Sequence, residues 1–72
     1  MADEVALAAS LEHGMRALAP EDRDALSAIS VFGLTYGEAS ETLGVPVGTV
    51  KSRVFRARRA LSITLGLVAG GA

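Results

Sequence analysis

Apolar residues recur at intervals of three and four along much of this chain, which is the spacing of one face of an α-helix. The clearest run predicts a helix over about residues 47 to 62, with an apolar stripe made of Val47, Val50, Val54, Ala57 and Leu61. A similar run predicts a first helix over about residues 3 to 18, with the stripe Val5, Ala8, Leu11, Met15 and Leu18.

Two shorter helices are predicted between these runs. One covers about residues 20 to 32, because Pro20 suits a first helical turn and is followed by acidic residues that favour the positive end of a helix dipole. Gly33 is expected to end it. The other covers about residues 36 to 43, where Thr35 and Glu38 have the spacing of a capping box and Gly44 stops the helix.

Four helices without a strand pattern predict an all-α fold. No repeat or long linker divides the chain, so we expect one domain over residues 1 to 72, with a tail at residues 63 to 72. The short turn between the last two helices contains glycine, which is typical of a helix-turn-helix; a plain helical hairpin is the alternative. The expected core residues are Leu18, Leu26, Ile29, Leu34, Leu43, Val47, Val50, Val54 and Leu61.

Opposite its apolar stripe, the last predicted helix is cationic. Its outer face holds Ser52, Phe55, Arg56 and Arg59, and its flanks hold Lys51, Arg58 and Arg53. A basic stripe is often no more than a solvated face. An aromatic residue in the middle of that face argues against this interpretation and favours a recognition helix for DNA.

Charge is strongly separated along the chain. The formal net charge is only −1, yet all eight acidic residues lie within residues 1 to 50, whereas five of the seven basic residues lie within residues 51 to 72. The two segments therefore carry −6 and +5. This separation favours a surface for a polyanion on the C-terminal segment.

The composition argues against several other classes of protein. The chain has no cysteine, and its single histidine, His13, falls off the apolar stripe and is expected at the surface. We find no nucleophile with a base and no metal-binding cluster, so we expect neither an enzyme nor a cofactor. No apolar run approaches the ~20 residues of a membrane span, and the acidic N-terminus is unlike a secretory signal, so we expect a cytoplasmic protein without membrane insertion.

The segment from Leu34 to Arg53 reads LTYGEASETLGVPVGTVKSR and continues with FRARRAL from Phe55 to Leu61. It resembles the signature of region 4 in the extracytoplasmic-function (ECF) sigma factors of bacterial RNA polymerase. Residues 18 to 23 are similar to the leucine-proline motif of the same family. The resemblance implies a four-helix domain that binds the promoter −35 element in the major groove during transcription initiation.

The resemblance also implies roles for individual residues. The positions that match the family's base-reading residues are Ser52, Phe55 and Arg56. The expected phosphate contacts are the first-turn amides of Gly48 and Thr49 and the side chains of Lys51, Arg53, Arg58 and Arg59. These residue types suit the task, since arginine can contact guanine with two hydrogen bonds and a phenyl ring can touch a thymine methyl.

Some positions depart from the family's usual pattern. Gly37, Ser40 and Ser27 replace better helix formers or larger apolar residues, which should weaken packing. Phe32 occupies a position at which the family more often has a charged residue. We therefore expect it to bind a partner protein, either the β flap of the RNA polymerase core or an anti-sigma factor. The family's separate region that melts the −10 element is missing, so we expect part of a longer factor that cannot initiate transcription alone.

Two alternatives remain open. A LuxR-type response-regulator output domain shares the Gly-Leu-Thr opening and a Thr-Val-Lys, but such domains usually continue with histidine, where this chain has Ser52 and Arg53. A sigma-like decoy would bind an anti-sigma factor and never touch DNA. Such a decoy would not need the intact basic face, which counts against it.

Overall fold

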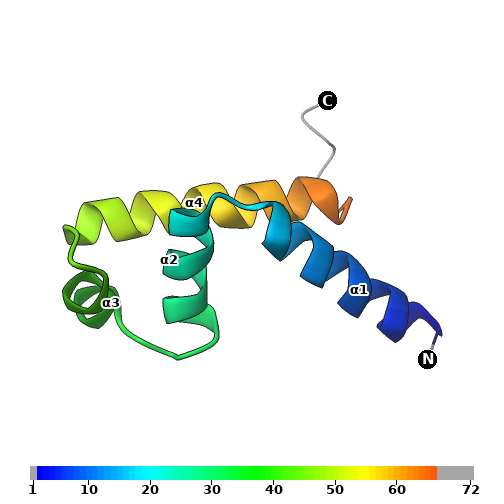
Figure 1. Ribbon diagram of the computed structural model, residues 1–72, viewed down its shortest axis with the longest axis horizontal. Helices are drawn as coiled ribbons and strands as arrows, with labels where there is room; N and C mark the ends of the chain where they lie inside the picture. The colour runs from blue at the N-terminus through cyan, green and yellow to red at the C-terminus, as the bar shows by residue number, and fades with distance from the viewer. Residues whose placement is uncertain (1, 67–72) are drawn as a thin grey trace.

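The computed structural model describes the backbone of residues 2–66 and the side chains of residues 8–66. These residues form four α-helices and no strand, which confirms the all-α fold (Figure 1). The helices are α1 (Ala2–Ala17), α2 (Pro20–Ser30), α3 (Tyr36–Leu43) and α4 (Val47–Thr64).

The ends of α2 and α4 differ from the prediction. α2 ends at Ser30 and not at Phe32. The amide of Val31 still donates to the carbonyl of Ser27 four residues back, but the amide of Phe32 donates to the same carbonyl, five residues back, and so leaves the helical series. Gly33 then takes a positive φ of 68°, which suits glycine. α4 continues to Thr64, so the predicted tail begins inside a helix, and its remainder at residues 67–72 lies outside the described residues.

α4 is the helix on which the others assemble. It runs along the length of the molecule, with α3 at its N-terminal end, α2 across its middle and α1 toward its C-terminal end (Figure 1). Ala25, Ala39 and Ala57 are completely buried where the helices meet. Because alanine adds little bulk, the backbones can approach one another closely at these points.

Most of the predicted core lies inside. Leu18, Leu26, Val50, Val54 and Leu61 are buried, and Ile29, Leu34 and Leu43 are partly buried against them. Val47 was predicted wrongly, since 38% of its surface is exposed. It is the first residue of α4, and the end of a helix has fewer neighbours than its middle.

The crossing of α1 and α4 depends on Gly14. A glycine inside a helix costs about 1 kcal/mol relative to alanine, so its position in α1 is unfavourable on local grounds. In the structure, a Cβ atom at Gly14 would lie 2.7 Å from Cδ2 of the buried Leu61. Because glycine has no side chain, α1 can approach α4 closely at this position.

The turn between α3 and α4 has the predicted helix-turn-helix form. Thr35 and Glu38 make a complete capping box at the start of α3, and Gly44 ends the helix with φ 69°. Ser40 donates a 2.5 Å hydrogen bond from its hydroxyl to the carbonyl of Val45. This bond ties α3 to the turn that leads into α4.

Candidate nucleic-acid interface

The three predicted base-reading residues lie together on the outer side of α4. Ser52, Phe55 and Arg56 are exposed, and Phe55 presents 66% of its surface to solvent. Val50 and Val54 anchor the opposite side of the same helix in the core. The side of α4 that faces outward is therefore fixed by the packing of its apolar stripe.

Arg56 is not a free surface cation. Its Nη2 donates to Oδ1 of Asp22 at 2.9 Å, and its Nε donates to Oδ2 at 3.3 Å. The hydrogen bond to Asp22 and the charge of that carboxylate raise the pKa of Arg56 above its ordinary value. Arg56 therefore stays charged and is tied to the first turn of α2.

Asp22 is a residue of the site that sequence reasoning missed. The only sequence signal was that of an acid in a first helical turn, which is a common stabilising feature. Asp22 is the single charged residue among the buried side chains of residues 8–66. Its partner lies 34 residues further along the chain, so no local pattern could have joined them.

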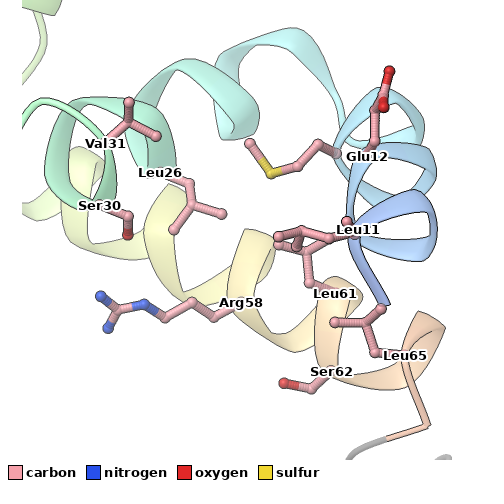
Figure 2. Close-up of a pocket in the computed structure, with 11 residues that line it drawn as sticks. Leu11, Glu12, Leu26, Ser30, Val31, Arg58, Leu61, Ser62 and Leu65 are labelled. Atoms are coloured by element: carbon pink, nitrogen blue, oxygen red, sulfur yellow. The ribbon is translucent and has the colours of Figure 1, made fainter. Parts of the chain in front are cut away.

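The predicted phosphate-binding side chains fall in different surroundings. Lys51 is exposed, with its Nζ 5.6 Å from the centre of the Tyr36 ring in α3, while Arg53 is half-buried and Arg59 is exposed. Arg58 lies at the edge of an apolar pocket between α1, α2 and α4, with its guanidinium pointing away from the leucines (Figure 2). Lys51, Arg58 and Arg59 are thus exposed cations, and of these four side chains only Arg53 is half-buried.

The two first-turn amides also differ. Pro46 has no side-chain oxygen to cap α4, so the amide of Gly48 is one of the donors that a helix start leaves without an intrahelical partner. The amide of Thr49 donates to the carbonyl of Pro46 at 3.0 Å. Gly48 is therefore better placed than Thr49 to hold a phosphate.

Apolar side chains remain exposed away from α4's outer face. Phe32 is 73% exposed at the rim of a pocket between the end of α2 and α3. Ser27, Leu34 and Leu43 also line this pocket. Because Phe32 is not in the core, its replacement by a polar residue should not by itself disturb the fold.

Within the described part of the chain, no three histidine, aspartate or glutamate side chains gather as metal ligands would. Likewise, none of the helices described is both long and apolar enough to span a membrane.

Comparison with known proteins gives consistent matches. The family model described as sigma-70, region 4 matches residues 8–61. The ECF RNA polymerase sigma factor SigE of Mycolicibacterium smegmatis is 44% identical over 55 residues, which are 76% of this chain and 21% of that protein. SigC of Mycobacterium tuberculosis is 48% identical over 44 residues, 61% of this chain and 24% of the relative.

The sigma-E factor of Escherichia coli K12 is 49% identical over 43 residues, 58% of this chain and 22% of the relative. No solved structure matched significantly. The chain thus spans only about a fifth to a quarter of the length of these curated relatives. The family match covers all of α2 and α3 and most of α1 and α4, including the capping box and the turn. On this evidence the chain belongs to the sigma-70 region 4 family, in the form found in ECF sigma factors.

Proposed function

We propose that this chain binds the promoter −35 element through the major groove, as the region 4 domain of an ECF sigma factor that directs RNA polymerase in transcription initiation. One observation carries the proposal: α4 buries its apolar side against three helices and leaves Ser52, Phe55 and Arg56 exposed on the other. A helix of this kind can enter the groove without any loss of core packing.

The chemistry of the outer face suits base reading. The guanidinium of Arg56 can donate two hydrogen bonds to O6 and N7 of guanine. The exposed ring of Phe55 can contact a thymine methyl, and the Ser52 hydroxyl can either donate or accept. Lys51, Arg53, Arg58 and Arg59, with the amide of Gly48, would contribute phosphate contacts that position the helix but do not specify sequence.

The alternatives gain less support. A family match to sigma-70 region 4 disfavours the LuxR-type output domain. A decoy for an anti-sigma factor would not require an exposed aromatic residue within a basic helix face. We infer a DNA-binding role without a catalytic step or cofactor, exercised in the bacterial cytoplasm where promoter DNA lies.

Selection from a randomised duplex pool tests the proposal directly. The purified chain is incubated with the pool, and bound duplexes are sequenced over several rounds. We expect one short motif to be enriched, and enrichment to fall as salt is raised because phosphate contacts release counterions. Capture of an anti-sigma factor with no enriched motif would instead identify the chain as a decoy.

Lys51→Ala should weaken binding to all duplexes by a similar factor. The lysine is expected to contact phosphate, so its loss should lower the slope of log K against log salt by about one ion without changing the preferred motif. Arg16→Ala is the matched control, since it removes the same charge from α1, where Arg16 pairs with Glu12. A changed base preference in Lys51→Ala would contradict the phosphate role.

Phe32→Glu should separate partner binding from DNA binding. We propose that Phe32 contacts the polymerase β flap or an anti-sigma factor, because a 73% exposed phenylalanine beside an apolar pocket offers surface for another protein. We expect Phe32→Glu to weaken capture by these partners while the fold and the gel shift with DNA stay nearly unchanged.

The second exposed phenylalanine supplies the control for this experiment. Phe55→Glu places the same charge on the outer face of α4, so it should abolish the gel shift and leave partner capture intact. If Phe32→Glu instead lowers thermal stability without a separate loss of partner binding, Phe32 has a structural role and the partner surface lies elsewhere.

A further inference from the structure

The pair formed by Asp22 and Arg56 has an unusual distribution of exposure. The Asp22 side chain is only 12% exposed, whereas the Arg56 side chain is 57% exposed. The buried carboxylate belongs to α2, and the arginine projects from the outer side of α4. Asp22 is therefore fixed in the fold, while Arg56 reaches the surface that is proposed to bind DNA.

The two hydrogen bonds occupy one edge of the guanidinium. A guanidinium has five N–H donors, and the carboxylate takes one from Nε and one from Nη2. Both donors of Nη1 and the second donor of Nη2 remain. The second donor of Nη2 and one donor of Nη1 form the end-on edge of the guanidinium, which can contact O6 and N7 of guanine together.

The pairing should also limit the conformations of Arg56 before DNA arrives. An unpaired carboxylate at a buried position is unfavourable, so the fold favours the rotamer of Arg56 that satisfies Asp22. A long side chain normally loses rotamer freedom when it is fixed at an interface. If the rotamer is already set, less of that freedom is lost on binding.

We propose that Asp22 is a positioning residue that holds Arg56 side-on, so that the free edge of its guanidinium is presented to a guanine of the bound duplex. This inference rests on the proposed function, because it assigns Asp22 a role in reading the same DNA. A different role is also conceivable for Asp22, that of a charge latch, which we define as an ion pair that holds Arg56 away from DNA; the two roles predict opposite effects of Asp22 substitutions on DNA binding. A latch would restrain Arg56 and reduce DNA binding, so its removal would strengthen binding.

The test compares Asp22→Asn and Asp22→Glu with the wild type. Asparagine keeps the shape but removes the charge and one acceptor, whereas glutamate keeps the charge and displaces the carboxylate by one methylene. Both proteins are first melted by circular dichroism. Each is then titrated against the selected duplex and against duplexes that replace every base pair in turn.

We expect both variants to lose about tenfold or more in discrimination at a single G·C pair, the pair at which Arg56→Gln also loses discrimination. In the Arg56→Gln background, Asp22→Asn should cause no further loss at that pair. Affinity for the other duplexes should hold, or rise slightly in Asp22→Asn because an acid is removed. A purely structural role for Asp22 would change the thermal stability of the domain but not its discrimination at this G·C pair.

Two results would overturn the inference while the proposed function stands. One is unchanged discrimination in both folded Asp22 variants. The other is tighter binding by Asp22→Asn to every duplex in equal proportion, which would identify a charge latch. If the wild type itself selects no motif, the proposed function fails first and the positioning role fails with it.

Discussion

Val50→Asp should leave the domain unfolded. Val50 is 0% exposed in α4, the helix against which the other three pack. A carboxylate placed there would be buried without a cationic partner in the core, and the cost of this exceeds the margin of stability of so small a domain. Val50→Ala should be milder, costing on the order of 1 to 3 kcal/mol from lost burial and the cavity left behind. Thermal melts followed by circular dichroism measure both effects.

Val47→Asp is the matched control for this experiment. It makes the same change in the same helix, three residues earlier, at a valine that is 38% exposed. A carboxylate in the first turn is also favoured by the helix dipole. We expect this variant to fold. A Val50→Asp protein that melts like the wild type would mean that α4 faces the other way, and the base-reading assignment would fall with it.

Arg56→Ala should reduce affinity for the preferred duplex by about ten- to a hundredfold and relax the preference at one base position. The reason is the loss of a two-bond contact to one base, while the phosphate contacts stay in place. Binding is measured against the selected duplex and its single-base variants at fixed salt. If all duplexes weaken equally, Arg56 contacts phosphate and does not read a base.

The pair with Asp22 affects how this result is interpreted. Arg56→Ala also leaves a buried carboxylate without its partner, so part of the loss could come from a less stable domain. Arg56→Gln keeps a hydrogen-bond donor near Asp22 and separates the two effects. Arg59→Ala serves as a charge-matched control, because Arg59 lies on the same outer face and has no described ion-pair partner.

The local features of this fold could be predicted because they depend on neighbouring residues. The capping box needs only a threonine and a glutamate three residues apart, and Gly44 ends α3 because glycine adopts a positive φ without strain. The burial of Val50 and Val54 follows from helical spacing alone. The same spacing put Ser52, Phe55 and Arg56 on the opposite side, so most of the candidate site was visible in the sequence.

Helix ends were less predictable because they depend on where the chain must turn next. Apolar spacing in the sequence runs on through Phe32, but two amides share the carbonyl of Ser27 and the chain leaves α2 earlier. Spacing also placed Val47 in the core, although the exposed end of a helix has fewer neighbours than its middle. Periodicity gives a residue's direction from the helix axis, but not whether another helix lies there.

By itself, the sequence determined the four helices, the turn between the last two and the basic outer face of α4, since each rests on interactions within a few residues. Only the tertiary structure decided what happens between helices distant in the chain. Gly14, unfavourable in an isolated helix, is what lets α1 approach Leu61. Asp22, an ordinary first-turn acid, becomes the buried partner of Arg56 because the packing of α2 across α4 brings their side chains within 2.9 Å.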